Sequence, residues 1–172
     1  VLAFWTGASS LATVMLDHGQ SNRYCQFVPG VKGTWHALSH WRDFRGDTED
    51  DDGVTKWDSA RSKRDMYDAV VRWHHERFAR FLGRLASLEE GGERLIDHSV
   101  VFYGSSISDG HEHGEADLPV MVAGKAGGAI QSGRRIESRR EVSMSSLHLA
   151  TLQAMGVKQD EFADADEPFN WL

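Results

Sequence analysis

Two stretches of the chain carry the apolar spacing of amphipathic helices. Between residues 62 and 90, apolar side chains recur near the 3.6-residue period and arginines fall mainly on the opposite face, which predicts a long helix. The pair Gly91–Gly92 should end this helix, because glycine is favoured just past a helix C-terminus. Residues 145–155 show a similar pattern, with serine at the start and Gly156 at the end, so they predict a second helix.

Short apolar runs elsewhere predict β-strands. Residues 11–17 and 99–103 are interpreted as buried strands that each enter a polar loop, and residues 118–123 as a third strand. Residues 129–137 could form a hairpin partner after a Gly-Gly pair. Strands that alternate with helices predict an α/β fold, here with a mixed, mostly parallel sheet flanked by helices.

Residues 18–60 lack either period and predict a long irregular region. They are rich in glycine, aspartate and serine, but Trp35, Trp41 and Trp57 indicate a packed loop. The acidic run at residues 47–53 suggests a calcium loop at first. Its ligand positions break the EF-hand pattern, so a solvated acidic loop is the preferred interpretation.

Composition narrows the class of protein. The chain has 172 residues, of which 40% are hydrophobic and 26% charged, and this predicts one globular domain spanning residues 1–172. The net charge of −7 argues against nucleic acid as a partner, and no apolar run is long enough to span a membrane. The single cysteine, Cys25, excludes an internal disulfide. Because the chain does not begin with Met, we expect it to be the C-terminal part of a longer protein or a mature fragment.

Nine histidines are an unusually high number, and several lie in loops that follow predicted strands. Asp17 and His18 follow the first strand. After the second strand, aspartate, histidine and glutamate occupy every second position from Asp109 to Asp117, with His111 and His113 between them. If this stretch is extended, all of these side chains project to one side as a dense set of metal ligands. A polar surface loop is the alternative interpretation.

A third histidine cluster is His36-Ala37-Leu38-Ser39-His40. In a helical turn, histidines at positions i and i+4 face the same way and can chelate one metal ion. Two unrelated loop histidines would produce the same spacing. His74 lies beside apolar residues of the long predicted helix, so we expect a core or metal-supporting role for it.

These residues resemble a known family over nearly the whole chain. The shared features include Val1-Leu2-Ala3-Phe4, the segment LATVML, Gly19-Gln20-Ser21-Asn22-Arg23, His36-Ala37-Leu38-Ser39-His40, His74 to Leu82, Leu95-Ile96-Asp97-His98-Ser99, Tyr103-Gly104-Ser105, Ser108-Asp109-Gly110, His113, Asp117-Leu118-Pro119, Val122-Ala123-Gly124 and Gly133-Arg134-Arg135. The chain resembles the C-terminal half of the HXXSHH family, exported bacterial proteins of unknown function. The resemblance implies a periplasmic or secreted location.

The chain departs from the family pattern at four positions. Trp41 replaces the last histidine of the signature and Trp35 a histidine that often precedes it, while His111 and Glu115 replace asparagine and histidine. The ligand set that the resemblance implies is therefore His36, Ser39, His40, Asp109, His113 and Asp117. The layout is similar to that of the alkaline phosphatase and sulfatase superfamily, in which Asp and His from loops after parallel strands hold divalent cations.

The sequence thus predicts a metal-dependent hydrolase of an ester, such as a phosphate or sulfate ester or a lactone. The predicted metal ligands are Asp109, His113, His36, His40, Asp17 and His18, holding zinc, manganese or calcium. His111 or Asp117 would act as general base or support the ligands, and Ser39 is a weaker candidate nucleophile. The partners expected are a small-molecule substrate and the N-terminal half of the protein.

Two other functions fit the same sequence. The chain could be a non-catalytic exported module whose histidines bind a metal or whose tryptophan-rich region binds a ligand. It could also be an inactive scaffold fragment. A catalytic metal site keeps one coordination position for water, whereas a structural site is closed.

Overall fold

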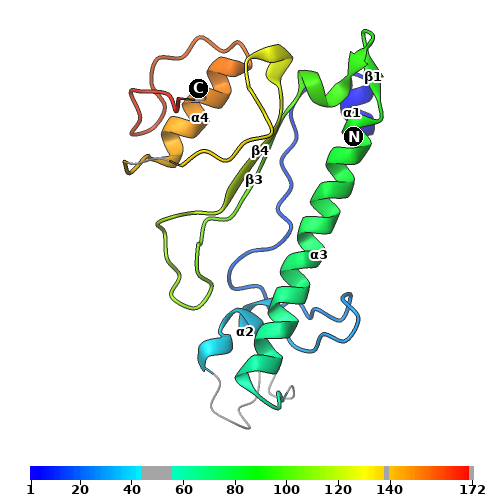
Figure 1. Cartoon of the computed structure of the whole chain (residues 1–172), viewed down its shortest axis with the longest axis vertical. Coiled ribbons are helices and arrows are strands. Elements are labelled where there is room, and N and C mark those ends of the chain that lie inside the picture. Colours follow the sequence, from blue (N-terminus) through cyan, green and yellow to red (C-terminus); the bar gives the residue numbers. More distant parts are fainter. Residues whose placement is uncertain (44–55, 138–139, 171–172) are drawn as a thin grey trace. The chain divides into compact units, whose positions relative to one another are not determined.

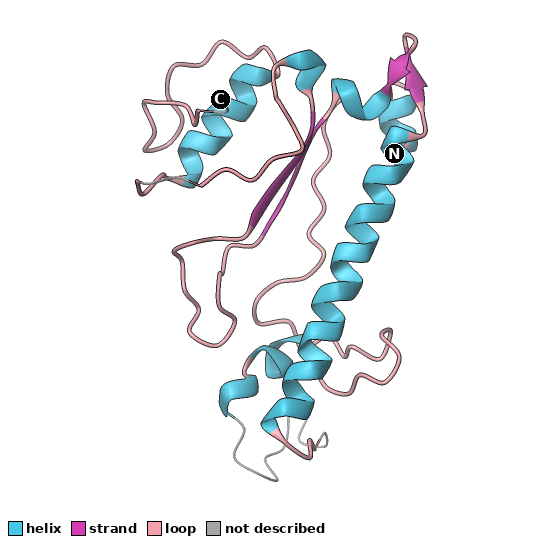
Figure 2. Cartoon of the chain, in the orientation of Figure 1, coloured by secondary structure: helices cyan, strands magenta, loops and turns pink. Residues whose placement is uncertain are grey.

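The computed structural model describes residues 1–43, 56–137 and 140–170, and the acidic run at 47–53 lies outside this part of the chain. Figure 1 and Figure 2 show its elements. In chain order they are α1 (Leu2–Trp5), α2 (Trp35–Ser39), the 3-10 turn η1 (Trp41–Asp43), α3 (Ala60–Ala86), β1 (Glu89–Glu90), β2 (Glu93–Arg94), η2 (Leu95–His98), β3 (Val100–Gly104), β4 (Val120–Gly124), η3 (Ala126–Gly128) and α4 (Met144–Ala154).

The predicted mostly parallel sheet is wrong. Within the described ranges, strands form only two small antiparallel pairs, β1 with β2 and β3 with β4. The strands predicted at 99–103 and 118–123 correspond to β3 and β4, but residues 129–137 form no strand. β3 and β4 therefore make a hairpin with a long loop. Because the two strands are antiparallel, their carboxyl ends do not meet at one edge to gather ligands.

The apolar run at residues 11–17 is also not a buried strand. It has no regular secondary structure, and Leu11, Val14 and Met15 are 80%, 80% and 78% exposed. A β-strand is stable only when a neighbouring strand satisfies its backbone groups. Nothing in the described part of the chain pairs with this run, so its composition alone does not produce a strand.

The two predicted helices are confirmed. α3 begins two residues before the predicted range and ends at Ala86, because residues 89 and 90 pair with the next strand before Gly91 turns the chain. In α4, the Ser143 hydroxyl accepts a hydrogen bond from the Ser146 backbone N–H at 3.3 Å. Gly156, with φ of 83°, follows its C-terminus in a conformation that favours glycine.

The described residues pack into two compact units. The first unit contains residues 1–6, 82–103 and 121–172, and the second contains residues 7–81 and 104–120. All predicted site residues belong to the second unit. Among the described residues, no helix has both the length and the apolar character needed to cross a membrane.

The core of the second unit joins the irregular region to α3. Its buried members are Cys25, Val28, Val31, Ala37, Leu38, Trp57 and Val70. Trp35 and Tyr67 pack against this cluster and stack on each other at a ring distance of 5.2 Å. Leu38 and Ala37 anchor α2 in the core. The prediction of a packed, tryptophan-containing loop region therefore agrees with the described part of residues 18–60.

His74 is buried in α3, as the prediction of a core histidine expects. Its ring meets Trp35 and Trp73 edge-on, each at 5.4 Å, and its buried Nε2 atom has no hydrogen-bond partner among the described residues. Burial lowers the pKa of His74, with Asp17 opposing this effect and Arg23 and the neighbouring His75 adding to it. The folded chain therefore favours the neutral ring.

Replacing His74 should make the chain more resistant to acid. The unfolded state binds a proton near pH 6.5 and the folded state only at lower pH, so stability falls as pH drops below 6.5. For one proton the slope is at most about 1.4 kcal/mol per pH unit. In His74→Leu, the melting temperature should fall less between pH 7.5 and pH 5 than in the wild type. The exposed neighbour offers the control, His75→Gln, and equal falls in all three proteins would contradict the prediction.

Candidate metal centre

Two histidines reach the site from α2 and the residue that follows it. The Thr34 hydroxyl accepts a hydrogen bond from the Ala37 backbone N–H, which fixes the start of this one-turn helix. His36 lies inside the helix and His40 caps it, so their rings project to the same side. Their Nε2 atoms are 3.2 Å apart. The predicted i, i+4 arrangement is therefore present.

Two further histidines come from a tight turn in the β3–β4 loop. The Asp109 side-chain oxygen Oδ1 accepts hydrogen bonds from the backbone N–H groups of His111 and Glu112, and the Asp109 carbonyl accepts one from His113. A bond from the Ser108 backbone N–H to the Gly114 carbonyl closes the turn. The stretch is thus folded, and the predicted extended array of alternating ligands is wrong. An aspartate followed by glycine favours such a turn because its carboxylate satisfies the next backbone donors.

His113 adopts a left-handed backbone, with φ of 54°, to direct its ring at the site. A non-glycine residue in this region stores backbone strain of about 1 kcal/mol or more. The ring centroids of His113 and His111 lie 5.1 Å and 5.6 Å from that of His40. The turn therefore delivers two imidazoles to the histidine pair of α2.

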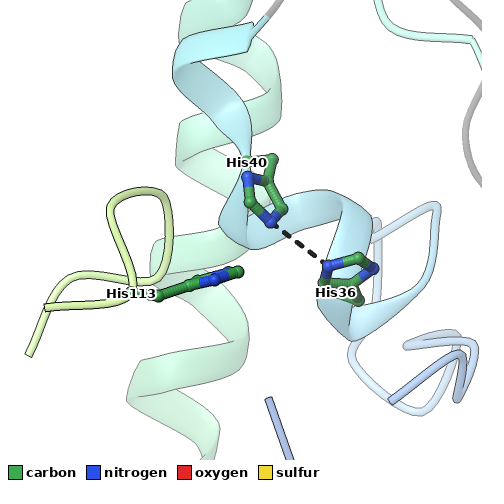
Figure 3. Close-up of side chains that lie close together, drawn as sticks. All are labelled: His36, His40 and His113. Atoms are coloured by element: carbon green, nitrogen blue, oxygen red, sulfur yellow. Dashed lines mark hydrogen bonds between the residues drawn. The ribbon is translucent and has the colours of Figure 1, made fainter. Parts of the chain in front are cut away.

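The first potential metal site consists of His36, His40 and His113 (Figure 3). One ligand nitrogen from each ring lies within 4.8 Å of the other two. A tetrahedral zinc ion bound to two imidazoles at its usual bond length holds their nitrogens about 3.3 Å apart. The 3.2 Å separation of the His36 and His40 nitrogens fits this spacing, and a His113 nitrogen lies within 4.8 Å of both.

The second potential metal site shares His40 and adds Asp43 and His111. The Asp43 carboxylate oxygen Oδ2 lies 3.5 Å from His40 Nδ1 and 3.6 Å from His111 Nδ1. Asp43 is not among the site residues predicted from the sequence. Its position three residues after His40, in the turn η1, places it on the same side as the histidine and could have identified it.

Contacts outside the rings hold the turn against α2. The Arg42 guanidinium lies 2.9 Å from an Asp109 carboxylate oxygen and 3.8 Å from Glu112. The Asp109 pKa is held below its usual range by the backbone hydrogen bonds from Glu112 and His111 and by Arg42, so the carboxylate stays charged in this clamp. Arg42 was also missed from the sequence, because its partner lies far along the chain.

Ser39 also contacts the turn that carries His111 and His113. Its hydroxyl donates a hydrogen bond to the His36 carbonyl at 2.7 Å and lies 3.4 Å from the Gly110 carbonyl. Among the described residues, no histidine nitrogen accepts a hydrogen bond from it, so nothing there activates it as a nucleophile. Ser39 is thus the residue of α2 that faces the turn.

Several other predicted ligands do not join the cluster. Asp109 uses its carboxylate within the turn and on Arg42, and Asp117 is exposed in a left-handed conformation. Asp17 accepts a hydrogen bond from the His18 backbone N–H and affects the pKa of His74, while His18 is exposed. None of these four belongs to either group of potential ligands found in the described residues. The structure brings together four of the predicted site residues, His36, His40, His111 and His113.

The surroundings of His40 favour its neutral ring. Burial and the neighbouring histidines His36 and His113 lower the pKa of His40, and Asp43 only partly opposes them. The buried Lys63 donates a hydrogen bond to the His40 carbonyl at 3.2 Å. A neutral imidazole keeps a lone pair for a cation, so His40 is suited to metal binding at neutral pH.

Replacing His113, which has the strained backbone, should raise the stability of the metal-free chain and abolish metal binding. Asparagine tolerates the left-handed backbone well, so His113→Asn should stabilise the metal-free chain by up to about 1 kcal/mol. The same change should abolish zinc binding. Chemical denaturation and zinc titration measure the two effects. The matched control is Asp117→Asn, at φ of 52° in the same loop, which should keep zinc binding. Zinc affinity that survives His113→Asn would contradict the assignment of His113.

Comparison of the chain with known protein families, with curated proteins and with solved structures finds no match.

Proposed function

We propose that this chain is a zinc-dependent hydrolase of an ester-type substrate, with its catalytic ion held by His36, His40 and His113. The observation that carries the proposal is the convergence of three imidazoles without a fourth protein ligand among the described residues. Three protein ligands and one position for water distinguish catalytic zinc sites from structural ones.

The donor set favours zinc over the other ions predicted. Manganese and calcium prefer carboxylate and carbonyl oxygens, whereas imidazole nitrogens suit zinc. All three ligands of the first site are imidazoles, and burial keeps His40 neutral. Bound zinc would polarise the ester and lower the pKa of a water molecule, so that attack at neutral pH becomes feasible.

The other residues of the site orient and support the ligands. His111 lies beside His40 but outside the first group of ligands, so its ring is placed to support the zinc site without binding this ion. Arg42 and Ser39 hold the turn that carries His111 and His113. The proposed substrate is a small phosphate ester, sulfate ester or lactone, and the exported location remains part of the proposal through the family resemblance.

A non-catalytic metal-binding module is the second candidate. It is favoured by the fact that the ligands come from two segments far apart in the chain, since the contacting residues Ser39 and Gly110 are 71 residues apart. A cation there would fix the turn to α2 whether or not it performs chemistry.

Metal analysis combined with a substrate panel tests the proposal. The untagged chain is loaded with Zn²⁺, passed through a desalting column, and assayed by plasma mass spectrometry and with nitrophenyl phosphate, nitrophenyl sulfate and a thiolactone. Hydrolysis lost on chelation, restored by Zn²⁺ and abolished in His36→Gln supports the hydrolase. The control Glu115→Gln, at an exposed position of the same loop, should behave as the wild type.

The remaining outcomes decide between the candidates. Bound zinc without hydrolysis of any substrate on the panel would contradict the hydrolase and favour the metal-binding module. A folded chain that retains no zinc would contradict both.

A further inference from the structure

The two ring nitrogens of His40 face two different groups of ligands. Nε2 lies 3.2 Å from His36 Nε2, and Nδ1 lies 3.5 Å from Asp43 Oδ2. We propose that Asp43, His111 and His40 Nδ1 hold a second divalent cation, so that the His40 ring bridges two ions. The inference rests on the proposed function, because it adds this position to the zinc site made by the three imidazoles.

The distances around Asp43 suit a shared cation better than hydrogen bonds. Its Oδ2 atom lies 3.5 Å from His40 Nδ1 and 3.6 Å from His111 Nδ1. Hydrogen bonds between nitrogen and oxygen usually measure about 2.7–3.2 Å, so both separations are too long. Two ligands of one zinc ion lie about 3.3 Å apart, which a shift of a few tenths of an ångström would reach.

His111 supplies an independent observation. Its Nδ1 atom is buried and has no hydrogen-bond partner within the described ranges. Leaving a buried polar atom unsatisfied costs about 1–3 kcal/mol, so native structures rarely retain one. A cation bound to Nδ1 would satisfy the atom. Glu112, with a carboxylate oxygen 3.5 Å from His111 Nε2, is placed to attract the ring proton that then resides on that nitrogen.

The charges of the second site differ from those of the first. Asp43 contributes a carboxylate, and the neutral His40 ring releases its one remaining N–H proton to solvent when the second ion binds. The Asp109 carboxylate is held by Arg42 and by backbone donors, so it does not compete for this ion. Nitrogen ligands with one carboxylate suit zinc, cobalt and copper ions.

Stoichiometry tests the second site. Wild-type chain titrated with Zn²⁺ in a calorimeter, then desalted and analysed for metal, should retain two ions. Asp43→Asn should retain one, because the amide is a poor ligand without charge. The Asp43 side chain is 58% exposed, so this variant is expected to fold. Glu115→Gln should retain two.

The failures can be told apart. One ion in the wild type, lost in His36→Gln and unchanged in Asp43→Asn, would overturn the second site and leave the proposed function standing. No ion in the wild type would overturn both.

Spectroscopy tests the bridge itself. In the chain loaded with two Cu²⁺ ions, magnetic coupling through the His40 ring should alter the electron paramagnetic resonance spectrum, and Asp43→Asn should restore the spectrum of an isolated Cu²⁺ ion. Two bound ions with uncoupled spectra would overturn the bridging role of His40.

Discussion

Saturating zinc should raise the free energy of unfolding of the second unit by about 4 kcal/mol when free Zn²⁺ exceeds its dissociation constant a thousandfold. The reason is that His36 and His40 belong to α2, whereas His111 and His113 belong to a turn far along the chain. Only the folded chain brings these rings together, so zinc binds the native state preferentially. Urea unfolding at fixed zinc concentrations, compared with unfolding in chelator, measures the effect.

His40→Ala tests whether the stabilisation by zinc comes from the two groups of ligands described above. His40 is shared by both groups of ligands, so its loss should remove the response to zinc at any concentration below the millimolar range. His75→Gln changes an exposed histidine of α3 and should keep the full response. Equal stabilisation of the wild type and His40→Ala would show that zinc binds elsewhere in the chain.

The helices could be predicted because their signals are local. α3 and α4 are specified by apolar periodicity and, in α4, by the Ser143 cap and Gly156 within the same segment. A strand depends on a partner that the local pattern does not identify. Residues 11–17 have strand composition, yet Val14 is 80% exposed and the described structure pairs nothing with the run. The predicted sheet is wrong because a strand partner was assumed for this run.

In the candidate site too, the features that could be predicted are those set by local spacing. The spacing of His36 and His40 predicted their common face, because a single helical turn decides it. The 109–117 loop contains two of the clustered histidines. The turn that begins at Asp109 brings His111 and His113 to the site, whereas Asp109 and Asp117 belong to neither group of potential ligands in the described residues. The role of Arg42 depends on Asp109, which lies far along the chain, whereas the spacing of Asp43 three residues after His40 is a local signal.

The docking of this turn depends on a close approach at Gly110. A Cβ atom added there would lie 2.8 Å from Ser39 Cβ and 3.5 Å from the Tyr67 hydroxyl. Ser39 is buried and belongs to α2, so it has little freedom to move away. The absence of a side chain at Gly110 thus lets the turn approach the helix that carries His36 and His40.

Gly110→Ala should therefore weaken zinc binding strongly. The backbone of Gly110 does not have a positive φ, so alanine fits its conformation and the change tests contact alone. Overpacking of this kind costs about 1–3 kcal/mol. If the turn must dock before zinc binds, the affinity falls by about 10- to 100-fold. Zinc titration of the variant against the wild type measures this loss.

Matched variants separate contact from other causes. Within the described residues, a Cβ atom at Gly114 meets only the Ser108 hydroxyl, at 2.9 Å. This hydroxyl can rotate away by giving up its hydrogen bond to the Gly114 carbonyl, so Gly114→Ala should affect affinity far less. Ser39→Gly removes the clashing Cβ and should restore zinc binding to Gly110→Ala, whereas Ser39→Ala keeps the Cβ and should not. A double-mutant cycle built from these proteins reports the coupling between the two positions directly. Equal effects of Ser39→Gly and Ser39→Ala would contradict docking of the turn through this contact.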